Sequence, residues 1–173
     1  MELCYLRSDH DIKEARGLFQ EYAESLDFDL CFQNFDEELE KLPEQYARPD
    51  GCLLLAREHG ETIGCVALRP LEPGVCEMKR LYVKPYHRGS GVGRRLAEAI
   101  ISEACSRGYR TMRLDTVPSM REARALYTSL GFLTIPPYRH NPIPGALYFE
   151  LDLTIASLSR NTRHSNGHSK RRR

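Results

Sequence analysis

The chain has 173 residues, of which 41% are hydrophobic and 28% charged, and these values fit one globular domain with a single well-developed core. No stretch approaches the roughly 20 apolar residues that a membrane-spanning helix needs, and the N-terminus lacks the apolar run of a secretory signal, so we expect a cytoplasmic protein without a membrane partner. Six of the 25 basic residues follow Asp152, which leaves 19 of them against 24 acidic residues in the rest of the chain. A nucleic acid is therefore not an expected partner of the domain, because nucleic-acid binders present a basic face.

Apolar spacing and turn residues predict alternating strands and helices between residues 1 and 153, which we take as one domain. The predicted strands cover, in chain order, residues 3–7, 51–57, 62–69, 75–83, 110–116, 132–135 and 146–153. The predicted helices run from Ser8 or Asp9 to Leu26, from Asn34 to about Pro43, and over residues 91–107 and 120–130. Antiparallel strands first, followed by strand–helix–strand–helix–strand, indicate a mixed α/β sheet with helices on its faces. Residues 154–173 form a basic tail that we expect to be disordered.

The six cysteines are scattered and include no CxxC pair, so the sequence supports neither a zinc site nor a redox dithiol. Several of them stand inside apolar runs, as Cys52 and Cys65 do. We therefore expect small buried hydrophobic residues in a reducing compartment, and no metal ion as cofactor.

A glycine-rich segment stands between the predicted strand 75–83 and the helix that follows it. Its sequence is Arg88-Gly89-Ser90-Gly91-Val92-Gly93. Glycines let successive backbone N–H groups point into one concavity, and the positive end of the helix dipole adds to their attraction for an anion. With ionic contacts from Arg88 and Arg94, the arrangement suits a pyrophosphate. The spacing differs both from GxxxxGK(S/T), which excludes a nucleoside-triphosphate loop, and from the GxGxxG of dinucleotide-binding folds.

Two motifs within residues 75–132 together resemble the core of the GNAT superfamily of N-acetyltransferases. Arg88, Gly91 and Gly93 match its cofactor motif, Arg/Gln-x-x-Gly-x-Gly/Ala, and the preceding Leu-Tyr-Val-Lys-Pro is similar to the family's fourth strand. Residues 123–132, Ala-Arg-Ala-Leu-Tyr-Thr-Ser-Leu-Gly-Phe, resemble the family's A-x-x-x-Y-x-x-x-G-F helix end. The resemblance implies a GNAT-like α/β fold with a mixed, mostly antiparallel sheet of six to seven strands, splayed at strands 4 and 5 and flanked by about four helices.

The resemblance also implies acetyl-coenzyme A (acetyl-CoA) as the donor substrate. In the family its pantetheine arm lies like an added strand in the gap between the splayed strands, so backbone groups of Leu81 and Val83 would bind it. Backbone N–H groups from Arg88 to Arg94 would hold the pyrophosphate. The expected cofactor contacts come from Leu81, Tyr82, Val83, Arg88, Gly89, Ser90, Gly91, Val92, Gly93, Arg94, Thr116 and Ala123.

One position departs from the family pattern. Met120 stands where the family often has an asparagine that contacts the coenzyme, and a thioether cannot donate the same hydrogen bond. That contact would come from Ser119 or Thr116, or be absent.

The expected chemistry is direct attack by a primary amine on the thioester in a ternary complex. Most amines are protonated at pH 7, so a base must take a proton, and the departing thiolate benefits from an acid. Glu77 stands six residues before Val83, where histone-type members of the family carry the base; the alternative is a solvated charge at the start of a strand. Tyr127 matches the tyrosine that many members use as the acid, and its alternative role is packing on an amphipathic helix.

The acceptor site of such enzymes is built from the first two helices and the loop before the last strand. Here the first region covers about residues 23–46 and the second about residues 136–145. The acidic residues of the first include Glu24, Asp27, Asp29, Asp36, Glu37, Glu38 and Glu40. They would either attract a cationic amine such as a polyamine or form the solvated face of surface helices. In the second region Tyr138 borders the site, and Arg139 could bind a substrate carboxylate by a bidentate contact. The two regions indicate opposite substrates, so the choice stays open.

Three functions are consistent with these residues. The leading one is acetyl transfer from acetyl-CoA to a primary amine of a small molecule, either an amino acid or a polyamine-like compound. The alternatives are a peptide or protein N-acetyltransferase and a non-catalytic acyl-CoA-binding module. The family also includes homodimers, and nothing in the sequence decides for or against one.

Overall fold

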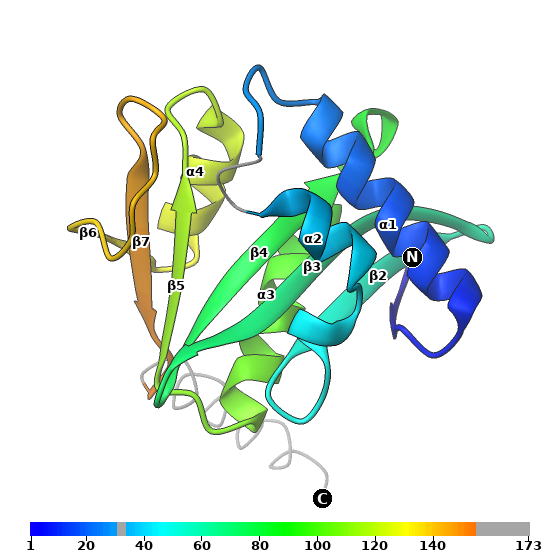
Figure 1. The fold of residues 1–173 in the computed structure, drawn as a ribbon, viewed down its shortest axis with the longest axis horizontal. Coiled ribbons are helices and arrows are strands. Elements are labelled where there is room, and N and C mark those ends of the chain that lie inside the picture. Colours follow the sequence, from blue (N-terminus) through cyan, green and yellow to red (C-terminus); the bar gives the residue numbers. More distant parts are fainter. Residues whose placement is uncertain (31–33, 155–173) are drawn as a thin grey trace, which may run out of the picture.

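The computed structural model describes residues 1–30 and 34–154, which form a seven-stranded sheet with helices on both faces (Figure 1). The strands are β1 (Glu2–Tyr5), β2 (Cys52–Glu58), β3 (Glu61–Glu72), β4 (Val75–Val83), β5 (Thr111–Thr116), β6 (Leu133–Ile135) and β7 (Leu147–Asp152). The helices are α1 (Asp9–Glu24), α2 (Phe35–Glu40), α3 (Val92–Ser106) and α4 (Arg121–Ser129), with short 3-10 turns η2 (Glu44–Tyr46) and η3 (Pro85–His87). Cys31 and residues 155–173, nearly all of the predicted tail, lie outside the described residues.

The strand order in the sheet is β1-β2-β3-β4-β5-β7-β6. Neighbouring strands run antiparallel, except that β4 and β5 are parallel. The predicted mixed, mostly antiparallel sheet of six to seven strands with about four helices is therefore confirmed. Among the described residues, no helix is both long enough and apolar enough to cross a bilayer.

α1 begins where the sequence predicts it, because Ser8 and Asp11 cap its first turn. The Ser8 hydroxyl accepts a hydrogen bond from the backbone N–H of Asp11 at 3.2 Å, and the Asp11 carboxylate accepts one from the Ser8 N–H at 2.9 Å. Asp11 also pairs with Arg57 of β2 at 2.6 Å. The same carboxylate thus fixes both the start of the helix and its attachment to the sheet.

α2 is shorter than predicted. It ends at Glu40, and the chain continues through a separate 3-10 turn, η2. Pro43 explains the difference, because a proline disfavours helical backbone angles at the residue before it, here Leu42, and supplies no N–H group of its own.

α1 and α2 cover one face of the sheet, and α3 lies on the other (Figure 1). An apolar core lies on each face. α3 places Leu96 and Ile100 in the core that it shares with α4, and α1 and α2 place Phe19 and Phe35 in the other. The described cysteines are all free; Cys52, Cys65 and Cys76 are buried as predicted, and Cys4 and Cys105 are half-buried.

The sheet opens between β4 and β5, which confirms the predicted splay. The two strands pair only at their starts, the last pair being Glu77 with Arg113, although β4 runs on to Val83 and β5 to Thr116. A β-bulge accompanies the opening: Lys79 faces Ala67 of β3 and Tyr82 faces Cys65, so β4 carries one more residue than β3 between these pairs. Arg80 in the bulge has a φ of +55°.

Candidate active site

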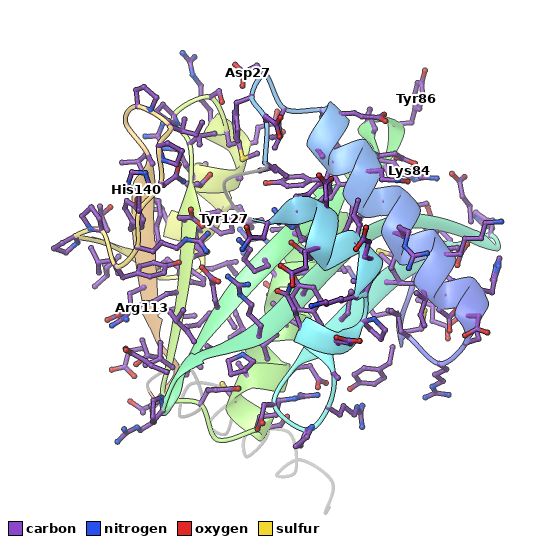
Figure 2. The ribbon with its side chains drawn as sticks, viewed as in Figure 1. Asp27, Lys84, Tyr86, Arg113, Tyr127 and His140 are labelled. Carbon is purple, nitrogen blue, oxygen red and sulfur yellow. The ribbon has the colours of Figure 1, made fainter. Side chains whose placement is uncertain are left out.

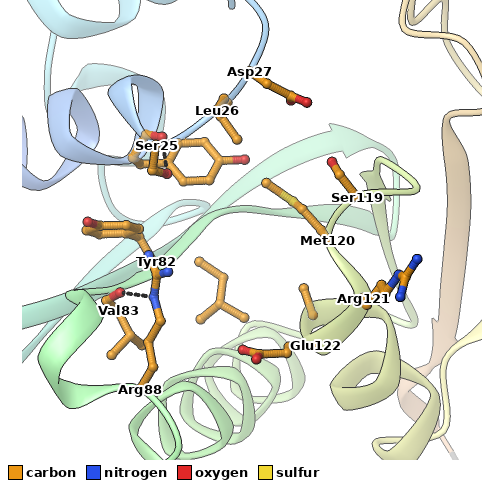
Figure 3. A pocket seen from close by; sticks show the side chains of 13 residues that line it. Ser25, Leu26, Asp27, Tyr82, Val83, Arg88, Ser119, Met120, Arg121 and Glu122 are labelled. Atoms are coloured by element: carbon orange, nitrogen blue, oxygen red, sulfur yellow. Dashed lines mark hydrogen bonds between the residues drawn. The ribbon is translucent and has the colours of Figure 1, made fainter.

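A cleft of about 690 Å³ lies where β4 and β5 separate (Figure 3). One wall is formed by Leu81, Tyr82 and Val83 of β4, three of the predicted cofactor contacts. The opposite wall contains Ala123 of α4, also predicted, together with Ser119 and Met120 before that helix. The end of α1 and the residues after it close a third side through Ser25, Leu26 and Asp27.

A smaller cavity of about 60 Å³, which we call the inner cavity, lies deeper between the same strands and shares Leu81 and Ala123 with the cleft. Its lining adds Thr116 of β5 and Tyr127 of α4, so two further predicted residues are brought to the splay. It also adds Lys79, which the sequence reasoning did not single out.

The glycine-rich segment connects η3 to α3, and two of its glycines adopt positive φ angles there. Gly89 and Gly91 have φ values of +77° and +86°, in the left-handed region that favours glycine, and Gly91 is the N-cap of α3. Within the described part of the chain no side chain caps this helix, so the N–H groups of its first turn remain available to an anion. Gly89, Ser90 and Gly91 are exposed, whereas the Val92 side chain is buried, so Val92 offers its backbone alone.

Arg88 connects this segment to the cleft. Its Nε donates a hydrogen bond to the carbonyl oxygen of Val83 at 2.9 Å, its guanidinium lies 5.6 Å from the centre of the Tyr82 ring, and it lines the cleft (Figure 3). Arg94 points elsewhere, since it donates to Ser129 of α4 at 2.6 Å and pairs with Glu98 at 3.6 Å. The residues fit an extended anionic ligand that enters the cleft past Arg88.

Tyr127 lies inside the body of the protein (Figure 2). Its ring packs against Phe132 at 5.8 Å and Phe149 at 6.2 Å, so the predicted packing role is part of what it does. It also borders the inner cavity. Burial raises the pKa of Tyr127 above its usual value, which keeps the phenol protonated at neutral pH, the state that a proton donor needs.

Met120, which stands where the family often has an asparagine, contacts Thr116. The Thr116 hydroxyl donates to the Met120 sulfur at 3.5 Å, and both residues line the inner cavity. Of the two residues expected to replace the family's asparagine, Ser119 lines the larger cleft and Thr116 the inner cavity.

Glu77 is fully buried, so the alternative of a solvated charge is wrong. One carboxylate oxygen accepts a hydrogen bond from the Tyr138 hydroxyl at 2.7 Å and pairs with Arg139 at 3.1 Å; the other pairs with Arg69 at 2.8 Å. Glu77 lines neither the cleft nor the inner cavity. Its role as the base stays a prediction.

Five charged residues form a buried or half-buried group, which we call the central charge cluster: Arg69, Glu77, Lys79, Asp115 and Arg139. Arg139 joins Glu77 to Asp115, and Asn141 donates to Asp115 at 2.8 Å. Burial alone would raise the pKa of Asp115, but the charges of Lys79 and Arg139 hold it below its usual value. Burial lowers the pKa of Lys79 to about 7, and the neighbouring Arg80 charge acts in the same direction.

The predicted acidic region does not form a wall of the cleft. Of the seven acidic residues named for it, only Asp27 lines the cleft. Glu38 is buried against Arg80 at 2.5 Å, and Glu37 pairs with Lys41 at 2.7 Å. Among the described residues, no group of three or more His, Cys, Asp or Glu side chains is placed to hold a metal ion.

Comparison with known proteins agrees with this geometry. Residues 15–132 match the model of the acetyltransferase (GNAT) family. An uncharacterized N-acetyltransferase of Schizosaccharomyces pombe is 45% identical over 89% of this chain and 96% of its own length. The N-acetylaspartate synthetase of Xenopus tropicalis is 31% identical over 63% of this chain and 41% of its own.

A GNAT-family acetyltransferase of Staphylococcus aureus has the same fold, with a TM-score of 0.72 and 18% identity over 88% of this chain and 98% of its own. The family uses acetyl-CoA as donor. The chain belongs to the GNAT family of acetyltransferases and is an acyl-CoA N-acyltransferase.

Proposed function

We propose that this protein transfers the acetyl group of acetyl-CoA to the primary amine of a small molecule that also carries a carboxylate, such as an amino acid. The observation that carries the proposal is the cleft at the β4–β5 splay, which Arg88 of the glycine-rich segment lines, together with the adjoining inner cavity, which Lys79 and Asp115 of the central charge cluster line. A cytoplasmic location remains a prediction from the sequence, which decides neither for nor against a homodimer.

Backbone groups are expected to make most of the contacts with the donor, acetyl-CoA. Acetyl-CoA supplies a thioester, whose acyl carbon is open to attack by an amine. We expect N–H groups at the start of α3 to bind the pyrophosphate and Arg88 to add a positive charge beside it. The edge of β4 beyond Glu77 has no pairing with β5, so Leu81 and Val83 can bind the pantetheine amides as an added strand would be bound.

We propose roles in the reaction for two side chains, Tyr127 and Glu77. Tyr127 would give a proton to the departing thiolate, a role that its protonated state and its place at the inner cavity support. For Glu77, predicted as the base, the contacts support a positioning role, because the carboxylate holds both Tyr138 and Arg139. Proton acceptance by Glu77 through a water predicts that Glu77→Gln abolishes turnover, whereas a positioning role predicts a raised acceptor KM.

The proposed class of acceptor substrate follows from the charges of the residues near the cleft. The central charge cluster holds three basic and two acidic side chains, which favours an anionic group on the substrate when Lys79 is protonated. A polyamine would need a surplus of acidic groups, whereas the cleft is lined by Asp27 and Glu122 together with Arg88 and Arg121. The name of one relative, N-acetylaspartate synthetase, supports an amino-acid acceptor as well.

The test is a panel of amines with acetyl-CoA, read as release of the CoA thiol. Each amino acid is paired with the amine that lacks its carboxylate, as alanine is with ethylamine, and spermidine and a short peptide complete the panel. We expect saturable release with one or more amino acids and a lower kcat/KM with the paired amines. Saturation by spermidine or the peptide alone would refute the proposed acceptor class. No release with any amine, while CoA still binds, would favour the non-catalytic binding module.

A matched variant sharpens the assignment. Arg139→Gln should raise the KM of the amino acid about tenfold or more, which corresponds to about 1.4 kcal/mol, and should leave the KM of the paired amine unchanged. Equal effects on both substrates would mean that Arg139 supports the fold of the site and does not bind a carboxylate.

A further inference from the structure

Lys79 differs from the other lysines of the chain in where its side chain lies. The chain has five lysines: Lys13, Lys41, Lys79, Lys84 and Lys170. Lys13 is exposed, Lys41 forms an exposed pair with Glu37, and Lys84 pairs with Glu61 near the surface. Lys79 is 6% exposed and lines the inner cavity together with Leu81 and Tyr127. Of the four lysines in the described part of the chain, it alone borders this cavity.

The pairing of β4 with β3 shows on which face of the sheet Lys79 lies. Lys79 faces Ala67, which belongs to the core under α1 and α2. Its side chain therefore lies on the face of the sheet that these helices cover, where the acceptor site is expected. The groups that face it come from every neighbouring element: Glu77 and Arg80 of β4, Asp115 of β5, Arg139 of the loop before β7, Glu38 of α2, Tyr22 of α1 and Tyr127 of α4.

The amine of Lys79 is also suited to act as a nucleophile. With a pKa of about 7, roughly half of it is neutral at pH 7. An ordinary lysine has a pKa of about 10.4, so less than about one in a thousand of its amines is neutral at that pH. A neutral amine beside the site proposed for the thioester is chemically equivalent to the acceptor substrate.

We propose that Lys79 is acetylated by the donor bound to the same molecule when no acceptor amine is present. The proposal rests on the proposed function in one respect, that acetyl-CoA binds between β4 and β5. The Nζ lone pair attacks the thioester carbonyl carbon, a C–N bond forms and the C–S bond breaks. The thiol leaves with the proton that Nζ loses, delivered by way of Tyr127 or water.

Acetylation would change the site in two ways. The amide that forms carries no charge, so the central charge cluster loses one of its three positive groups. The added acetyl group would occupy part of an inner cavity of only about 60 Å³. An enzyme supplied with donor but lacking acceptor would therefore lose activity with time, and an acceptor amine would protect it.

The test uses the full-length wild-type protein and acetyl-CoA without any amine, followed by intact mass measurement and peptide mapping over time. We expect one acetyl group, located on Lys79, added at a rate that does not depend on protein concentration. The rate should rise with pH through about pH 7 to a plateau above about pH 8, because the neutral amine is the reactive form. Lys79→Arg should remain unmodified, and the matched surface variant Lys84→Arg should be acetylated as fast as the wild type.

Two results would overturn the proposal. One is an unmodified Lys79 in protein that binds acetyl-CoA by calorimetry; the other is modification of surface lysines at the same rate as Lys79. Because the wild-type peptide map locates the modification, the outcome does not depend on the folding of the variants. Failure of acetyl-CoA to bind at all would refute the proposed donor site and this inference together, whereas failure of Lys79 alone leaves the amine panel unaffected.

Discussion

Glu38 and Arg80 form a buried ion pair that joins α2 to the bulge of β4. Both side chains are 2% exposed. The Arg80 Nε donates to Glu38 at 3.0 Å and an Nη at 2.5 Å, and the Tyr46 hydroxyl donates to the same carboxylate at 2.5 Å. Burial would raise the pKa of Glu38, but the hydrogen bonds and charge of Arg80 outweigh it and hold that pKa below its usual value.

Replacing Glu38 by Gln keeps the shape of the side chain and removes the charge that faces Arg80. Breaking a buried pair from one side costs about 3–5 kcal/mol, because a desolvated charge loses its counter-charge. Arg80 also has a left-handed φ, a conformation that costs about 1–3 kcal/mol and persists only where its surroundings enforce it. Against a total stability of about 5–15 kcal/mol, Glu38→Gln should therefore remove a large part of the free energy of unfolding.

Urea unfolding followed by circular dichroism measures this loss directly. The control is Glu37→Gln, one residue away, where the pair with Lys41 is half-exposed and the substitution should leave the unfolding midpoint near that of the wild type. A Glu38→Gln variant that loses less than about 1 kcal/mol would refute the reasoning, because that is the range of surface pairs.

Two further predictions concern Tyr127 and Asp11. Tyr127→Phe keeps the packing ring and should lower kcat about a hundredfold, with an unchanged CoA dissociation constant in calorimetry; an unchanged kcat would leave packing as its only role. The hydrogen bond from Arg57 and the backbone N–H of Arg7 hold the pKa of Asp11 well below its usual value. The ionised Asp11 therefore stabilises the fold above about pH 4, and this contribution is lost as the pH falls further. Urea unfolding from about pH 7 to pH 2 measures it: the free energy of unfolding should fall less steeply with decreasing pH in Asp11→Asn than in the wild type.

Local sequence signals accounted for much of the fold. The bounds of β4 agree with the predicted 75–83, because a turn at Gly74 and the proline at 85 mark both ends. α3 lies within the predicted 91–107, since Gly91 and Gly108 flank its apolar face. The splay itself followed from the family resemblance and could not be derived from spacing.

The acceptor half of the site was harder to predict because long-range pairs create it. Nothing near Glu38 in the sequence indicates that its partner is Arg80, 42 residues later, so its charge looked like part of a solvated face. Asp115 and Arg139, 24 residues apart, meet only because β5 lies beside β7 and the loop before β7 folds over both. Lys79 looked like one more charge on a strand, and it borders the inner cavity because β4 and β5 no longer pair beyond Glu77.

The central claim is that the N-terminus of α3 binds the pyrophosphate of the donor. It can be tested with two glycines of similar positive φ: Gly91, the N-cap of α3, with φ +86°, and Gly108, just after α3, with φ +80°. A side-chain atom added at either would meet nothing within 4 Å, and the helix separates them by about 22 Å. Replacing either by Val introduces a similar backbone strain, on the order of 1–2 kcal/mol.

The decisive measurement is the dissociation constant of CoA by calorimetry for Gly91→Val and Gly108→Val. Both variants should lose similar stability. Only Gly91→Val should weaken binding, by about tenfold or more, because the first-turn N–H groups of α3 would no longer point at the phosphates. An unchanged dissociation constant for Gly91→Val, or an equal loss in both variants, would contradict the account.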